Sequence, residues 1–228
     1  KFIMPFVILG VVLSTLHQSS LGSLLLIQPQ KLHPLWWTPI LPILFFTSAI
    51  AVGLAMIILE SSLSSRYFQR GLETHLLAKL AKAIPVVLVV YALIKFGDLI
   101  VAGDLGYLFT SGWMSVLFWA EILIGVVFPI VWFSIPKNRS NPNLLLTGAI
   151  VTLLGLILNR FNVSWFAVKH PDPLFYLPTF MGNVKYFPTL PEVAVSIGIF
   201  SAGILAFGLI AKYFPVFEDE GRAAHAGD

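Results

Sequence analysis

Six long apolar stretches, separated by polar or proline-rich segments, are the feature that most constrains this chain of 228 residues. A bilayer core about 30 Å thick is crossed by a helix of roughly 20 residues that rises about 1.5 Å per residue. The six runs are approximately 2–27, 39–59, 83–101, 113–133, 144–159 and 193–213. Strand-like alternation of polar and apolar residues is absent, which excludes a β-barrel. The sequence predicts an all-α, polytopic transmembrane helical bundle with six spans over residues 1–214, and a disordered cytoplasmic tail over 215–228.

The amino-acid composition of the chain excludes several classes of function. Hydrophobic residues make up 57% of the chain and charged residues only 11%, against about 25% charged in soluble domains. The net charge of +3 is too small to build the basic face that nucleic-acid binding needs. There is no cysteine, so this chain offers no thiolate for a metal site or an iron–sulfur cluster. Any such cluster must belong to a partner. Nucleotide-binding loops, nucleophile elbows and paired-histidine metal motifs are also missing, so the sequence gives no support to a hydrolase or a nucleotide-driven function.

The basic residues divide unevenly between the two sides of the predicted bundle, nine against four. One side holds Lys1, Arg66, Arg70, Lys79, Lys82, Lys137, Arg139, Lys212 and Arg222, and the other holds Lys31, Arg160, Lys169 and Lys185. By the positive-inside rule the richer side, with the C-terminus, is expected in the cytoplasm. Segment 160–192 then faces outward, into the periplasm of a bacterium. Because Lys1 opens the chain without signal-peptide features, we expect the later part of a longer polypeptide.

A polar cluster in the middle of the first span is the richest candidate site. At helical spacing Ser14, His17 and Gln18 share one face. A hydroxyl, an imidazole and an amide can donate hydrogen bonds to a quinone carbonyl or pass a proton to it. The alternative is that these side chains bond to neighbouring membrane helices and only hold the bundle together.

Charged residues inside other spans are further candidates, because an ionisable group in hydrocarbon is costly unless it is paired or hydrated. Glu121 lies eight residues into the fourth span, roughly 12 Å below its edge, where a carboxyl can relay protons or be paired structurally. Lys95 and Asp98 are three residues apart, so they can neutralise each other, or act in gating. A secondary proton path would use Glu60, Lys95, Asp104 and Arg160, although interfacial Glu60 and Arg160 can instead snorkel or pair.

A haem held by this chain alone is not expected. A bis-histidine haem needs two axial histidines on facing helices, and only His17 lies well inside a span. The remaining histidines are His33, His75, His170 and His225.

Several short stretches of the sequence also resemble those of a known family. The matching stretches are Gly10–Gly22, Leu32–Pro39, Ala49–Met56, Asp98–Gly103, Phe118–Gly125 with Pro129, Asn159–Val163 and Pro188–Glu192. They resemble, in family order, the integral membrane subunits of the NrfD/polysulfide reductase family, and within it the hydrogenase-2-type (HybB-like) membrane subunit. Such subunits have about eight to ten helices, so the resemblance covers the C-terminal part of one.

This resemblance implies a membrane anchor without a metal cofactor of its own, with menaquinone as the implied quinone. It would exchange electrons between the quinone pool and a periplasmic, ferredoxin-like iron–sulfur subunit. The further catalytic partner would be a hydrogenase, a molybdoenzyme or a multihaem cytochrome. The outward segment 161–191, which contains Tyr176 and Tyr186, is the expected docking surface. Two rivals are a proton or solute transporter and a purely structural anchor.

Overall fold

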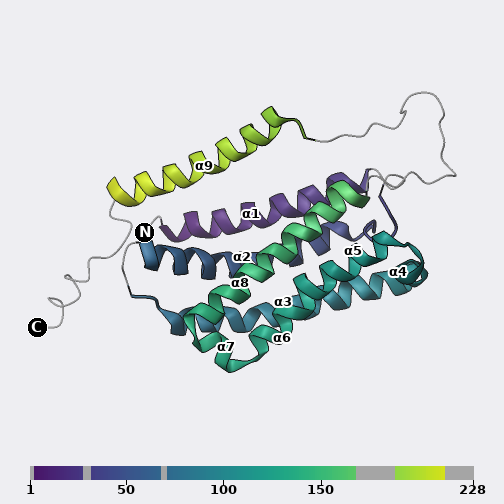
Figure 1. Cartoon of the computed structure of the whole chain (residues 1–228), viewed down its shortest axis with the longest axis horizontal. Coiled ribbons are helices and arrows are strands. Elements are labelled where there is room, and N and C mark those ends of the chain that lie inside the picture. Colours follow the sequence, from purple (N-terminus) through teal and green to yellow (C-terminus); the bar gives the residue numbers. More distant parts are fainter. Residues whose placement is uncertain (1–2, 28–31, 68–70, 168–187, 214–228) are drawn as a thin grey trace, which may run out of the picture. The chain divides into compact units, whose positions relative to one another are not determined.

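The computed structural model describes residues 3–27, 32–67, 71–167 and 188–213 (Figure 1). Within these ranges every regular element is a helix, and six helical segments are long and apolar enough to cross a membrane. The elements are α1 (Ile3–Leu26), α2 (Leu41–Tyr67), α3 (Thr74–Ala102), η1 (Asp104–Gly106), α4 (Tyr107–Thr110), α5 (Trp113–Ile122), η2 (Leu123–Val127), α6 (Phe128–Ser134), α7 (Pro136–Ser140), α8 (Pro142–Phe161), η3 (Asn162–Phe166) and α9 (Leu190–Tyr213). The prediction of an all-α bundle with six spans is confirmed.

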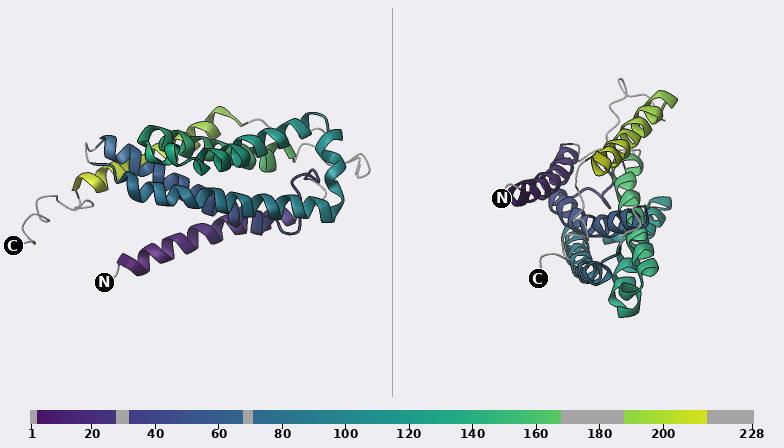
Figure 2. Two further views of the ribbon diagram at one scale, coloured as in Figure 1. Left: turned by 90° about the horizontal axis from the view of Figure 1, so that it is seen from below. Right: turned by 90° about the vertical axis from the view of Figure 1, so that its left-hand side faces the viewer.

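Four antiparallel spans form the core of the first compact unit, residues 1–176. Helix α2 packs against α3 and α8, while the continuous span made of α5, η2 and α6 packs against α3 and α8 and completes the ring. Helix α1 lies along the outside of α2 (Figures 1 and 2). The arrangement is an up-and-down bundle, in which facing side chains from every span meet at the centre.

Helix α9 belongs to the second unit, residues 177–228, and is described by itself. Its start is capped by its own sequence: the backbone N–H of Thr189 donates to Glu192 Oε2 at 2.7 Å. A Thr followed three residues later by Glu is the capping-box pattern of a helix N-terminus.

Helix boundaries differ from the predicted spans at three places. Helix α2 continues to Tyr67, well past the predicted end at residue 59. Helix α3 starts at Thr74, well before residue 83, because Lys79 and Lys82 are exposed while Leu77 and Ala81 on the opposite face are buried. The fifth span continues through η3 to Phe166, because Arg160, Asn159 and Asn162 find partners inside the protein. The expected outward connection therefore begins later than residue 161, and its Tyr176 and Tyr186 lie outside the described residues.

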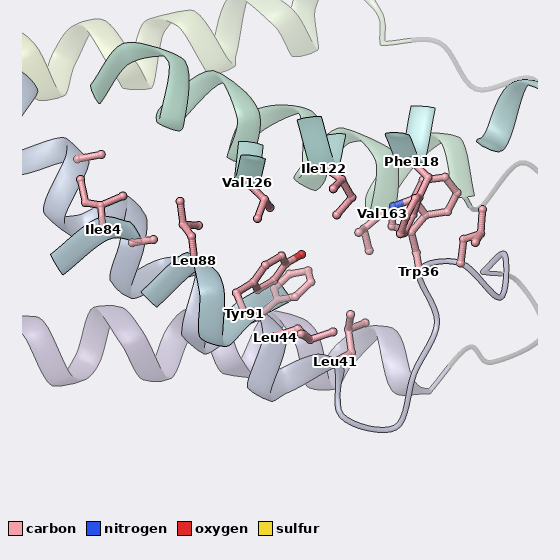
Figure 3. Packing of buried hydrophobic residues seen from close by; sticks show 14 of the residues in the cluster. Trp36, Leu41, Leu44, Ile84, Leu88, Tyr91, Phe118, Ile122, Val126 and Val163 are labelled. Carbon is pink, nitrogen blue, oxygen red and sulfur yellow. The ribbon is translucent and has the colours of Figure 1, made fainter. Parts of the chain in front are cut away.

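The two ends of the bundle carry different features, and they are called the loop end and the basic end. The loop end carries segments 32–40 and 103–112, and the basic end carries Arg66, Lys79, Lys82, Lys137 and Arg139. Towards the basic end the core is apolar and fully buried, with Ile58, Ile84, Phe133, Leu145 and Ala149 at 0% exposure. Towards the loop end the packed side chains include Trp36 and Phe118, and Tyr91 lies between the two regions (Figure 3).

Gly125 and Gly155 allow two spans of the bundle to approach at backbone distance. Gly125 lies in η2 and Gly155 in α8, and a Cβ added to Gly155 would overlap the Cα of Gly125. Small residues of this kind let membrane helices approach at backbone distance. This contact holds α8 against the fourth span about one helical turn from Glu121, on the side of the basic end.

Candidate functional site

A buried ion pair joins two spans in the middle of the bundle. Lys95 on α3 donates from Nζ to Oε1 of Glu121 on α5 at 2.7 Å. The side chains are only 6% and 2% exposed. This corrects the expectation that Lys95 and Asp98 neutralise each other on one helix face, because Lys95 crosses to the facing helix instead.

Both oxygens of Glu121 are occupied by donors from four parts of the chain. Oε1 also accepts from Asn159 Nδ2 at 2.6 Å, and Oε2 accepts from Trp36 Nε1 at 2.8 Å and Asn162 Nδ2 at 2.9 Å. A buried carboxylate is tolerated only when it is paired and hydrogen-bonded in this way. The segment before α2, together with α3, α5, α8 and η3, therefore meets at this one side chain.

Arg160 extends the cluster towards α1. Its Nη1 donates to Asn159 Oδ1 at 2.6 Å, and its Nη2 donates to Ser48 Oγ at 2.9 Å and to Gln18 Oε1 at 3.5 Å. The guanidinium carbon also lies 3.7 Å from the centre of the Phe45 ring, a cation–π contact. One hydrogen-bonded chain thus runs from Gln18 on α1 to Lys95 on α3.

Two small cavities flank this chain of contacts. The first faces the loop end and is lined by, among others, Trp37, Tyr91, Lys95, Asp98 and Arg160. The second lies deeper and is lined by Ser48, Tyr91, Glu121, Thr152 and Asn159 together with apolar side chains. In each, about 20 Å³ is open to the centre of a water molecule, which is room for roughly one water.

The structure brings several of the predicted site residues together and leaves others apart. Gln18, Lys95, Glu121 and Arg160 form the cluster, and Asp98 lines the first cavity beside it. Ser14 and His17 are exposed on α1, and Glu60 is exposed towards the basic end.

Asp104 lies apart from the cluster, in η1 at the loop end, where it is half-buried. Partial burial, and secondly the charge of Asp98, raise the pKa of the Asp104 carboxyl above its usual value.

Four residues of the cluster were not predicted from the sequence: Trp36, Ser48, Asn159 and Asn162. Trp36 is 2% exposed and donates to Glu121. Asn159 and Asn162 are uncharged, so a search for ionisable residues passes over them. Two amides near the end of an apolar run were the signal that could have identified them, since an amide in hydrocarbon also needs partners.

The other histidines within the described residues are His33 and His75. His33 is buried at the loop end, where its ring packs edge-on against Trp36 and Tyr107 and its Nδ1 accepts from the Leu35 N–H at 3.2 Å. His75 is exposed at the start of α3, and His170 and His225 lie outside the described residues. Among the described residues no group of three or more His, Cys, Asp or Glu is placed to bind a metal ion.

The fold and the buried cluster define a multi-pass membrane protein with a charged centre. A family model described as "Polysulphide reductase, NrfD" matches residues 1–166. The chain belongs to this family, as the sequence resemblance indicated.

Two relatives give this assignment more detail. The "Probable Ni/Fe-hydrogenase 2 b-type cytochrome subunit" of Escherichia coli is 34% identical over 94% of this chain and 53% of the relative. The "Menaquinone reductase, integral membrane subunit" of Nitratidesulfovibrio vulgaris is 29% identical over 93% of this chain and 53% of the relative. The chain therefore spans about half the length of these curated relatives. No solved structure shows significant similarity to it.

Proposed function

We propose that this chain is part of a quinone-reactive membrane subunit of a respiratory oxidoreductase, and that the cluster around Glu121 handles charge and protons for the quinone reaction. The observation that carries the proposal is the Lys95–Glu121 pair, held in mid-bundle by three further donors to the carboxylate. A quinone takes up protons as well as electrons when it is reduced. A carboxyl within the membrane that can exchange a proton is suited to that coupling.

The assembly proposed around this subunit rests on the family resemblance and is supported by the names of its two relatives. Electrons would pass between menaquinone and a ferredoxin-like iron–sulfur subunit on the periplasmic side, with a hydrogenase, a molybdoenzyme or a multihaem cytochrome as the catalytic partner. The basic end would face the cytoplasm of a bacterial or archaeal inner membrane, because its basic residues fit the positive-inside rule. The C-terminus would be on the same side.

The quinone ring itself is not proposed to occupy either cavity described above. Each has room for about one water molecule, far less than the several hundred Å³ of a typical small-molecule pocket. The described part of the chain would thus supply the charged and proton-exchanging side chains for the quinone reaction, and not the binding site of the ring. The ring would bind where this chain meets the remainder of the subunit or a partner.

The name of the Escherichia coli relative includes a b-type cytochrome, so we tested the described histidines against haem ligation. His33 packs among aromatic rings and accepts a backbone hydrogen bond, while His17 is exposed on α1. Neither residue lines one of the two cavities. The proposed reaction therefore does not use a haem bound by these two histidines.

A structural role for the same cluster is the second candidate, and the saturation of Glu121 by four donors favours it. In that case the carboxylate would remain ionised and would only join the spans. Replacing a buried ion pair by neutral groups is often harmless, whereas removing one partner is costly because the other charge is stranded. This asymmetry provides the test.

The test compares Glu121→Gln with the double variant Lys95→Gln/Glu121→Gln in the complete complex. The complex is reduced chemically, a soluble menaquinone analogue is added, and reoxidation of the partner's clusters is followed per assembled complex. If Glu121 carries protons, both variants react at least about tenfold more slowly, which corresponds to an activation barrier raised by ~1.4 kcal/mol. A double variant that assembles and reacts at the normal rate would leave Glu121 a structural residue.

A transporter is distinguished by a separate measurement. Purified and reconstituted without its redox partners, a transporter would still carry a proton or solute current in vesicles. The proposed subunit is expected to carry none under those conditions.

A further inference from the structure

Two residues that line the first cavity, Trp37 and Arg160, each carry a buried N–H group without an acceptor. Trp37 Nε1 and Arg160 Nε have no hydrogen-bond partner among the described residues, although the other guanidinium nitrogens of Arg160 are bonded. A buried donor without an acceptor costs about 1–3 kcal/mol. Two such donors at one cavity indicate a bound acceptor oxygen.

The size of the cavity limits what that acceptor can be. About 20 Å³ is open to the centre of a water molecule, and a buried water needs at least about 10–15 Å³ and two to four polar partners. A quinone ring or a lipid headgroup does not fit. A single water does, and its oxygen can accept from both N–H groups.

The surroundings of the cavity give such a water a route to the ion pair. Lys95 and Asp98 line the same cavity, and Asn159, which bonds to Glu121 Oε1, lines it as well. The charged or titratable groups around Glu121 are Lys95 and Tyr91 on α3, Arg160 on α8, and Asp98 one turn nearer the loop end. A water at this position can donate its own protons towards Asp98.

Towards the basic end, the described residues offer no comparable hydrogen-bonded link from the Lys95–Glu121 pair. The second cavity is bounded by Gly125 and Gly155, whose backbones touch, and by Leu88 and Val126. Beyond them the core includes Ile58, Ile84, Phe133, Leu145 and Ala149, all at 0% exposure. The buried hydroxyl of Ser62 in this region donates to the Ile58 carbonyl of its own helix at 2.6 Å. A proton would have to cross this mainly apolar layer to reach the basic end.

We propose that a water molecule is bound between Trp37 Nε1 and Arg160 Nε, and that it connects the Lys95–Glu121 pair through Asp98 to the loop end of the bundle. The water site itself stands on the cavity and its two donors. Its use as a proton link rests on the proposed function.

The water site is tested on the resting complex, without quinone turnover. A cryo-electron microscopy map that resolves ordered water should show one peak within hydrogen-bonding distance of both nitrogens. Infrared spectra in H₂O and H₂¹⁸O should show an O–H band that shifts with the isotope. Trp37→Phe should abolish this band. The matched control is Trp119→Phe, which should retain it because the Trp119 N–H already donates to the Leu108 carbonyl at 3.2 Å.

The link is tested by the cluster-reoxidation assay on Trp37→Phe, Asp98→Asn and Trp119→Phe. The first two variants should react several-fold more slowly and the control should not. A map with no water, or with a larger group in its place, overturns the site. A water that is present and lost in Trp37→Phe, with an unchanged rate, overturns the link. Either outcome is independent of Glu121→Gln, whose full activity would instead refute the proposed function.

Discussion

Asn159 Oδ1 accepts a hydrogen bond at 2.6 Å from Nη1 of Arg160, the next residue along α8. The same Asn159 amide donates from Nδ2 to Glu121 at 2.6 Å. The amide oxygen thus turns towards the cation and the amide nitrogen towards the carboxylate. A carboxamide offers a donor and an acceptor on one planar group, so Asn159 orients the two charges relative to each other.

Asn159→Leu keeps the volume and removes both bonds. We expect it to lower the stability of the assembled subunit by about 3–6 kcal/mol, because two charged partners each lose a buried hydrogen bond worth about 1.5–3 kcal/mol. Thermal unfolding of the complex in detergent measures this. Asn143→Leu is the comparison, since Asn143 bonds Arg66 at an exposed position. Equal effects of the two variants would contradict the bridging role.

Trp36→Phe removes the indole N–H from Glu121 Oε2 and keeps an aromatic ring against Phe118 and His33. The expected loss of stability is about 1.5–3 kcal/mol, the range for a hydrogen bond to a charged group. Trp132→Phe removes a bond to the neutral Leu144 carbonyl and should cost less, about 0.5–1.5 kcal/mol. Thermal unfolding that ranks the two variants in the reverse order would argue against an ionised Glu121.

Gly155→Ala should separate α8 from the fourth span, because its methyl group would overlap the Gly125 backbone. Overpacking of this kind costs typically 1–3 kcal/mol, and here backbone rather than a flexible side chain must move. The yield of assembled complex and its thermal midpoint report the loss. Gly53→Ala in α2, where a Cβ meets nothing within 4 Å, should be neutral or slightly stabilising.

Asp104 leads to a prediction about pH. Its raised pKa means that the folded protein disfavours the ionised carboxyl more than the unfolded chain does. That penalty is present at neutral pH and disappears as the pH falls below the usual carboxyl range. Asp104→Asn should therefore raise the thermal midpoint slightly at pH 7 and not at pH 3. The difference should shrink with salt, because the site is partly exposed. Glu60→Gln serves as the exposed control.

Much of the fold could be predicted because hydrocarbon imposes strict rules on length and polarity. The six spans follow from run length alone, and Lys95 and Glu121 were selected because charge inside a span is costly. The pairing of Lys95 could not be predicted. Its nearest carboxyl in the sequence belongs to Asp98, whereas Glu121 is 26 residues away, and only the rotation of α3 relative to α5 decides between them.

Predicting which neutral residues join the cluster requires even more knowledge of how the helices pack. Gln18 and His17 are adjacent in the sequence, yet Gln18 reaches Arg160 while His17 is exposed on α1. Which face of α1 meets α2 depends on Gly22, which packs directly against the backbone of Pro42. The pattern of polar residues within one helix contains no information about this contact.

The wide turn η2, immediately after Glu121, also constrains how the length of this span can vary. A π-helical turn is an α-helix that accommodates one surplus residue, and η2 places it between Glu121 and the rest of the span. Deleting one residue from Leu123–Val127 would allow a continuous α-helix but rotate its two halves by about 100° relative to each other. Glu121 and Gly125 could then no longer reach Lys95 and Gly155 together. Family members that shorten this turn are expected to lose either the carboxylate or the glycine contact.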